Sequence, residues 1–161
     1  MNEGKPQEGI SIVATNRQAG FNYVILDRFE AGLALKGSEV KSIREGRANL
    51  RDSYVRFQKN EAYVVNLHIS PYSHISFDAP EAARMRKLLM KRAEIARVAG
   101  TVTRKGFTCV PLKLYFKRGW AKLEIAICQG KKTYDRRESI KKKMDQREIN
   151  RSIKQAKKGA N

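Results

Sequence analysis

The residues of this chain with the most versatile chemistry are two histidines, His68 and His74, six positions apart. Imidazoles move protons near neutral pH, so such a pair could serve as the acid and base of a small metal-free ribonuclease. A zinc site would need further ligands at short spacing, and the sequence contains neither a CxxC nor an HExxH pattern. Nothing else supports catalysis, and we expect no catalytic residue, no metal and no cofactor.

The two cysteines, Cys109 and Cys128, each lie in an apolar run that is typical of a strand. A reduced thiol in such a run packs as a small hydrophobic side chain, and disulfides are rare in cytosolic proteins. We therefore predict two buried thiols.

Charge is the strongest signal in the composition. The chain has 34 Lys and Arg against 16 Asp and Glu, a net charge of +18. This charge favours nucleic acid as partner over an acidic membrane or a merely solvated basic surface. No run approaches the ~20 apolar residues of a spanning helix, and residues 1–8 lack the features of a secretory signal. We expect a cytoplasmic protein that does not enter a membrane.

Composition divides the chain into a polar leader (residues 1–9), a patterned body (10–129) and a basic C-terminal tail (130–161). The tail carries 12 Lys and Arg but only 4 Asp and Glu. Within it, Tyr134 lies among cations, where an aromatic ring can stack on a base while its neighbours hold phosphates.

The tail lacks the pattern of a helix that packs on a body. Ile140 and Ile149 fall on opposite sides of a helical wheel, so no single apolar stripe exists. Lys143 and Arg147 repel each other at a spacing of four residues. We predict a tail that is disordered in the free protein and becomes helical where phosphates surround it.

Short runs rich in β-branched and aromatic residues predict strands in the body. They cover residues 11–14, 21–27, 51–58, 62–69, 107–117 and 121–129. Turns are expected at 58–61 and 117–119. About six strands in a small body predict a mainly β fold with two or three helices, in which the strands form a closed or nearly closed barrel.

A first helix is expected from Ser38, as its N-cap, through Gly46. Glu39 would lie at its positive end, while Val40 and Ile43 would face inward.

A second helix is expected from Pro80 to Gly100, where apolar residues that include Leu88, Leu89 and Ile95 recur at helical spacing. Its other face would be basic, and it could face phosphates or simply solvent. The cations on that face are Arg84, Arg86, Lys87, Lys91, Arg92 and Arg97.

Eight aromatic residues lie among the predicted strands, where exposed rings could stack on bases. They are Tyr54, Phe57, Tyr63, Tyr72, Phe77, Tyr115, Phe116 and Trp120. Strand alternation instead places most of these side chains in the core.

Several segments, in the same order along nearly the whole chain, resemble one family, the SsrA-binding proteins (small protein B) that partner transfer-messenger RNA. The matching segments are Asn16-Arg17, residues 29–44, 49–54 and 69–72, Arg86-Lys87-Leu88-Leu89, residues 110–115, Gly130-Lys131-Lys132 and Asp135-Arg136-Arg137. Together these motifs are highly specific.

The resemblance implies an OB-type β-barrel, meaning an oligonucleotide-binding barrel, and a role in trans-translation. The body would bind the tRNA-like domain of transfer-messenger RNA in place of a missing anticodon arm. The tail would enter the empty mRNA channel of a stalled ribosome, near ribosomal RNA of the decoding centre. Elongation factor Tu and alanyl-tRNA synthetase would be indirect partners through the RNA, and the protein would act as a monomer.

The resemblance also implies the site residues. Asn16, Glu30, Leu89 and Lys91 match positions that contact RNA in the family, although position 91 varies. We assign RNA binding by the body to Asn16, Arg17, Glu30, Lys41, Arg44, Arg86, Lys87, Leu89 and Lys91. RNA or ribosome binding by the tail is assigned to Gly130, Lys131, Lys132, Tyr134, Asp135, Arg136, Arg137, Lys141, Lys142, Ile153 and Lys154.

The tail departs from the family at two of these positions. Tyr134 stands where some members carry His, which keeps stacking but loses the imidazole charge. Arg136 replaces the usual Lys, which keeps the charge and changes its geometry. The main alternative to this assignment is a basic ribosomal or single-strand-binding protein with the same barrel, and a small ribonuclease is the other.

Overall fold

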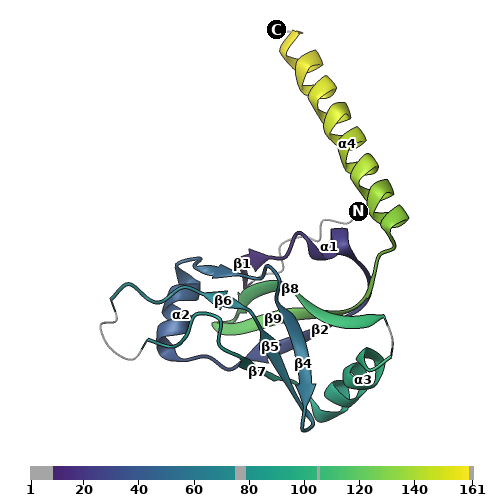
Figure 1. Cartoon of the computed structure of the whole chain (residues 1–161). Coiled ribbons are helices and arrows are strands. Elements are labelled where there is room, and N and C mark those ends of the chain that lie inside the picture. The colour runs from purple at the N-terminus through teal and green to yellow at the C-terminus, as the bar shows by residue number, and fades with distance from the viewer. Residues whose placement is uncertain (1–8, 75–78, 105, 160–161) are drawn as a thin grey trace. The chain divides into compact units, whose positions relative to one another are not determined.

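The computed structural model describes residues 9–74, 79–104 and 106–159, without the side chains of residues 133–135 and 159. Two compact units make up the chain, divided between Gly130 and Lys131. The first unit is a β-rich body and the second is a helix (Figure 1). Within the described part of the chain, none of the helices has the length and apolarity needed to cross a bilayer.

Nine strands and four helices occur in the described residues. The strands are β1 (Ile10–Thr15), β2 (Tyr23–Leu33), β3 (Ala48–Asn49), β4 (Tyr54–Gln58), β5 (Glu61–Val65), β6 (His68–Ile69), β7 (Arg86–Leu89), β8 (Phe107–Lys117) and β9 (Trp120–Gly130). The helices are α1 (Ala19–Asn22), α2 (Gly37–Arg44), α3 (Arg92–Val102) and α4 (Thr133–Gly159).

Seven of the strands form one antiparallel sheet in the order β1-β8-β9-β2-β7-β5-β4. The long strands β2, β8 and β9 form its centre, and β3 and β6 make a separate two-stranded sheet. Both expected turns are confirmed. Gln58 pairs with Glu61, and Lys117 pairs with Trp120 across Arg118 and Gly119, whose φ angles are 50° and 81°. Positive φ at both central residues is the geometry of a tight two-residue hairpin turn.

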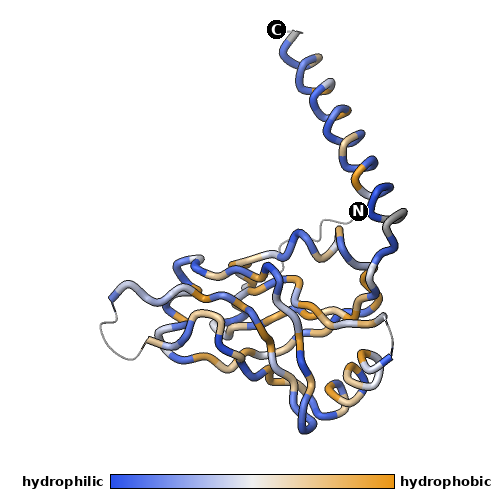
Figure 2. Tube along the Cα trace, viewed as in Figure 1, coloured by the Kyte–Doolittle hydropathy of each residue, from blue (hydrophilic) through white to orange (hydrophobic). Residues whose placement is uncertain are grey.

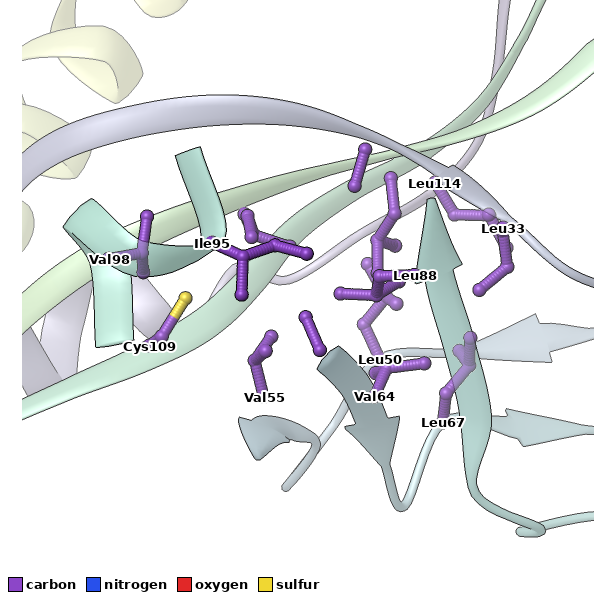
Figure 3. Packing of buried hydrophobic residues seen from close by; sticks show 14 of the residues in the cluster. Leu33, Leu50, Val55, Val64, Leu67, Leu88, Ile95, Val98, Cys109 and Leu114 are labelled. Atoms are coloured by element: carbon purple, nitrogen blue, oxygen red, sulfur yellow. The ribbon is translucent and has the colours of Figure 1, made fainter. Parts of the chain in front are cut away.

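The expected mainly β fold with helices is confirmed, but the sheet is open, so of the closed or nearly closed barrel of about six strands the closed form is not found in the part of the chain that the structure describes. β1 pairs only with the second half of β8, and the described residues contain no backbone ladder from β4 to the other edge of the sheet. Ile95 and Val98 of helix α3 pack in the same core as Val55 of β4 (Figure 3).

The core lies between the sheet and α3. Fully buried Leu88, Leu114, Leu123 and Ile125 come from three strands of the sheet, β7, β8 and β9. Apolar residues follow the strands of the body, whereas polar residues dominate α4 (Figure 2). Cys109 and Cys128 are buried free thiols, as predicted. Burial raises the pKa of Cys128 to about 11, and burial likewise raises the pKa of Cys109.

The second helix is shorter than predicted, because residues 86–89 form strand β7 and the helix begins only at Arg92. In β7, Arg86 and Leu88 face inward while Lys87 and Leu89 face solvent. That alternation has the period of a strand. The predicted basic helix face is therefore wrong, since Arg84, Arg86 and Lys87 lie outside the helix.

The first helix is confirmed, but its N-cap is Lys36 and not Ser38. The Glu39 carboxylate accepts a 2.9 Å hydrogen bond from the Lys36 backbone amide and so begins the helix two residues earlier. Ile43 is buried as expected, and Val40 is half-buried.

The tail forms the single 27-residue helix α4, so the prediction of a disordered tail is wrong for this structure. Lys, Arg, Gln, Glu, Ala and Met are strong helix formers, and Pro does not occur in this stretch. The Glu138–Lys142 ion pair, 3.3 Å long and four residues apart, adds local support. The apolar residues Ile140, Met144, Ile149 and Ile153 of α4 are all exposed.

Candidate nucleic-acid interface

One face of the sheet, which we call the outer face, carries polar side chains opposite the core. Cross-strand partners share a face, and Glu30 of β2 pairs with Glu124 of β9, which pairs with Lys113 of β8. The same alternation along β8 and β9 places four more residues on this face, which are Tyr115, Lys117, Trp120 and Lys122. Gly32 pairs with Leu89, which extends the outer face to β7.

A groove of about 850 Å³ lies on the outer face between β2, β7, the start of α3 and the β4–β5 turn. It brings together four of the predicted RNA-binding residues, Glu30, Lys87, Leu89 and Lys91. These come from positions up to 61 residues apart in the chain. The groove is also lined by the cations Lys59, Lys122 and Arg92 and by the half-buried Glu61 and Glu94, so cations outnumber carboxylates around the exposed Leu89.

Leu89 is the exposed apolar centre of the groove, with 55% of its surface accessible. Its side chain passes directly over Gly32, where an added Cβ would lie 3.1 Å from the Leu89 Cβ. A larger residue at position 32 would therefore push Leu89 out of place. The glycine allows the leucine to lie flat on the sheet and present its methyl groups to a ligand.

Glu30 is held by two side chains from β8. The Tyr115 hydroxyl donates a 2.5 Å hydrogen bond to its carboxylate, and the Lys117 ammonium lies 3.2 Å from the same oxygen. The Tyr115 hydrogen bond and the Lys117 charge lower the pKa of Glu30 despite some desolvation. Glu30 is therefore a fixed anionic acceptor in a basic groove. It can accept hydrogen bonds from base amino groups or ribose hydroxyls, but it would repel phosphate.

Lys87 makes a similar link on the other side of the groove. Its ammonium lies 2.8 Å from Glu61, which also accepts a hydrogen bond from the Tyr63 hydroxyl. The Lys87 hydrogen bond, followed by that of Tyr63, lowers the pKa of Glu61. Lys91 caps α3, where the Glu94 carboxylate accepts a 3.3 Å hydrogen bond from its backbone amide. The Lys91 ammonium is thus presented at a fixed helix start.

Asn16 and Arg17 lie outside this groove, in the turn between β1 and α1. The Asn16 side-chain amide donates a 3.0 Å hydrogen bond to the Pro111 carbonyl, and its oxygen accepts one from the Ala19 amide. Asn16 therefore fixes the turn, and Arg17 is exposed at its surface.

Lys41 and Arg44 are exposed on α2, also outside the groove. The Lys41 ammonium lies 5.5 Å from the centre of the Tyr72 ring, and the Arg44 guanidinium lies 5.7 Å from that of Phe116. Both distances are within the range of cation–π attraction. The two cations therefore have ordered aromatic supports and present their charges from a second surface, which we call the α2 surface.

Arg86 is the one predicted site residue of the body that is fully buried. Its guanidinium lies 2.7 Å from Glu39 and donates hydrogen bonds to the carbonyls of Leu67 and Ala82. Each nitrogen of the guanidinium donates a hydrogen bond inside the fold, so the charge of Arg86 does not face solvent. Arg86 instead anchors α2 to the segment before β7.

The predicted tail residues lie at the end of β9 and along α4. Gly130 closes β9, and the Lys131 ammonium donates a 2.9 Å hydrogen bond to the Ser139 hydroxyl. The exposed members are Lys132, Arg136, Arg137, Lys141, Lys142, Ile153 and Lys154. The side chains of Tyr134 and Asp135 lie outside the described residues.

Sequence reasoning missed three residues beside Glu30, which are Tyr115, Lys117 and Lys122. Alternation along β8 could have indicated that Tyr115 and Lys117 share the face opposite Leu114 and Phe116. Their partner Glu30, however, lies 85 positions away from Tyr115. The histidines of the nuclease hypothesis are both exposed, and His74 contacts the ring of Tyr72 at 5.1 Å.

Comparison with known proteins finds similar sequences and a similar structure. The model of a family described as SmpB protein matches residues 13–155. The SsrA-binding protein of Trichodesmium erythraeum (strain IMS101) is 53% identical over 152 residues, covering 94% of this chain and 97% of that protein. The SsrA-binding protein of Syntrophobacter fumaroxidans (strain DSM 10017 / MPOB) is 50% identical, covering 94% of this chain and 95% of that one.

A solved structure described as "tmRNA-SmpB: a journey to the center of the bacterial ribosome" has a chain with the same fold. Its TM-score is 0.64 at 45% identity, and the match covers 74% of this chain and 85% of that chain.

Proposed function

This chain belongs to the SmpB family, the non-enzymatic tmRNA-binding proteins of trans-translation, and we propose that its outer-face groove binds the tRNA-like domain of that RNA. The observation that carries the proposal is the meeting of Glu30, Leu89 and Lys91 in one groove. Each supplies a different contact that a folded RNA needs. The lysine attracts phosphate, the leucine packs on a base or ribose, and the carboxylate accepts a hydrogen bond from a base edge.

The proposed RNA-binding surface of the body combines this groove with the turn at Asn16 and Arg17, and it excludes Arg86. The α2 surface, with Lys41 and Arg44, would meet ribosomal RNA or a second part of the same RNA. The open seven-stranded sheet, with α3 packed against its core, would serve as the OB-type platform.

The tail would act as a separate unit. Its charge and the exposure of its cations fit a segment surrounded by phosphates on all sides, such as the mRNA channel of a ribosome. In this scheme the ribosome is the second direct partner, and elongation factor Tu and alanyl-tRNA synthetase act through the RNA. The protein works as a monomer in the cytoplasm, where translation takes place.

Competition binding tests the proposal against a general single-strand-binding protein of the same fold. Labelled tRNA-like-domain transcript is bound to the full chain and displaced with unlabelled transcript or with a polypyrimidine strand of equal length. We expect the transcript to compete at concentrations at least a hundredfold lower than those of the polypyrimidine strand. Equal competition by both strands would refute recognition of a folded domain and support general single-strand binding.

A further inference from the structure

Trp120 is the most exposed of the large hydrophobic residues that the structure describes, with 73% of its surface accessible. It is also the single tryptophan of the chain. Its position overturns the expectation that it packs in the core. An indole has a large apolar surface and exposing it to water is unfavourable, so an exposed one at a fixed position indicates a binding role.

The backbone around Trp120 is fixed by pairing. Trp120 is the first residue of β9 and pairs with Lys117 across a two-residue turn. That turn is specified by positive φ at Arg118 and Gly119, and the Arg118 amide donates a 3.3 Å hydrogen bond to the Gly9 carbonyl. The hairpin therefore presents the indole from a paired strand end and not from a long loop.

The indole also belongs to the same face as the groove. Trp120 and Lys122 are two residues apart on β9, so both lie on the outer face, and Lys122 lines the groove together with Glu30. Lys117, the cross-strand partner of Trp120, is the lysine whose ammonium lies 3.2 Å from Glu30. Leu89 pairs with Gly32, Gly32 pairs with Lys122, and Trp120 lies two residues before Lys122, so the outer face is continuous from Leu89 through Gly32 and Lys122 to Trp120.

The positive charge around Trp120 indicates which class of ligand binds there. Residues 117–123 contain three cations and no acidic residue. An apolar peptide could pack on the indole but would not pair with the cations, and an acidic protein could pair with the cations but would not cover the indole. A nucleotide does both, because its base stacks on the indole and its phosphate binds Lys117, Arg118 or Lys122. The base must be unpaired, since a base inside a duplex already has its faces covered.

We propose that Trp120 is a base-stacking site that holds one unpaired nucleobase of the RNA bound in the groove. This proposal rests on the proposed function, because it requires the RNA to lie on the outer face. It assigns to the β8–β9 hairpin a contact beside Lys122, across β2 from Leu89.

The single tryptophan allows a direct test, since all indole fluorescence of the full chain reports position 120. Titration with the tRNA-like-domain transcript should quench this fluorescence with the same midpoint as binding measured by gel shift. A fully paired RNA duplex of equal length should leave the fluorescence nearly unchanged. Quenching of equal size by the duplex would overturn base stacking.

Affinity of substituted chains supplies the second readout. Trp120→Ala should weaken transcript binding about tenfold, and Trp120→Phe, which keeps a stacking ring, should restore most of it. Leu26→Ala, on β2 outside the groove, is the control for removing an exposed apolar side chain from the sheet and should change affinity about twofold at most. Unchanged affinity in Trp120→Ala, with wild-type binding of the transcript intact, would overturn the stacking site alone. Failure of the wild-type chain to bind would overturn the proposed function itself.

Discussion

Arg86 and Glu39 form a buried ion pair, with the Arg86 Nη2 and Glu39 Oε1 atoms 2.7 Å apart and both side chains almost inaccessible to solvent. Arg84 completes the cluster at 2.6 Å from the other Glu39 oxygen. The pair joins α2 to the start of β7. It therefore fixes the α2 surface, with Lys41 and Arg44, relative to the groove that begins at Lys87.

Breaking this pair should destabilise the body. Arg86→Met removes one of the two guanidinium partners of the buried Glu39 carboxylate and also removes the Arg86 donors from the Leu67 and Ala82 carbonyls. We expect the free energy of unfolding to fall by about 3 kcal/mol, measured by urea denaturation. Arg47→Met is the matched control, because it removes an exposed arginine 3.7 Å from Glu45 and should cost less than about 1 kcal/mol. Equal losses in the two variants would contradict a structural role for the buried pair.

Acid should weaken the same cluster. Burial by itself raises the pKa of Glu39, but hydrogen bonds from Arg84, the Lys36 amide and Arg86 lower it overall. With the folded pKa below the unfolded value, the stabilisation is complete above the unfolded carboxyl pKa, about 4.3, and is lost as the pH falls through the folded pKa. The wild-type free energy of unfolding should therefore decrease more steeply below about pH 4.3 than that of Glu39→Gln. Parallel curves for the two chains, from urea denaturation between pH 7 and pH 3, would contradict the prediction.

Substitution of two exposed leucines of the sheet should distinguish an effect on RNA affinity from an effect on the free energy of unfolding. Leu89 lies in the groove and Leu26 lies on β2 outside it, with 55% and 52% of their surfaces accessible. Leu89→Ala should lower affinity for the tRNA-like domain about tenfold, the cost of losing one well-packed apolar contact. Leu26→Ala should leave affinity unchanged. Both should unfold within about 0.5 kcal/mol of wild type, because neither side chain is buried.

Equal losses of affinity from the two leucine substitutions would show that the RNA does not discriminate the groove from the rest of the sheet. Filter binding at a single salt concentration is the suitable measurement, since phosphate contacts make every affinity depend on salt.

The strands and turns around Trp120 were predictable because they depend on local patterns. Alternating apolar residues indicated β8 and β9, and the Arg118-Gly119 turn followed from its glycine. β7 was missed because Leu88, Leu89 and Ile95 also fit a helical period, and only tertiary pairing with β2 and β5 resolves that ambiguity. The groove was identified only in part. The family motifs supply Glu30 and Leu89, but Tyr115 meets Glu30 through a sheet register that no local pattern encodes.

Arg86 shows the opposite limit of sequence reasoning. In the sequence, an arginine among other cations is typical of a basic surface. Arg86 is buried instead because it pairs with Glu39, which lies 47 positions earlier in the chain. The tail shows a third limit, since repulsion between cations and strong helix propensity oppose each other there. Propensity prevails in the structure, which gives one continuous helix from Thr133 to Gly159.

The division between body and tail predicts two separable activities. A chain lacking residues 137–161 loses most of α4 but keeps every groove residue, so its affinity for the tRNA-like domain should stay within about threefold of wild type. Peptide tagging on stalled ribosomes in a reconstituted translation reaction should be abolished. Leu89→Glu is the reciprocal variant, since it places a like charge beside phosphates and should lower both RNA affinity and tagging. Equal loss of RNA binding and tagging in the truncated chain would contradict the division, because it would mean that α4 holds the tRNA-like domain as well.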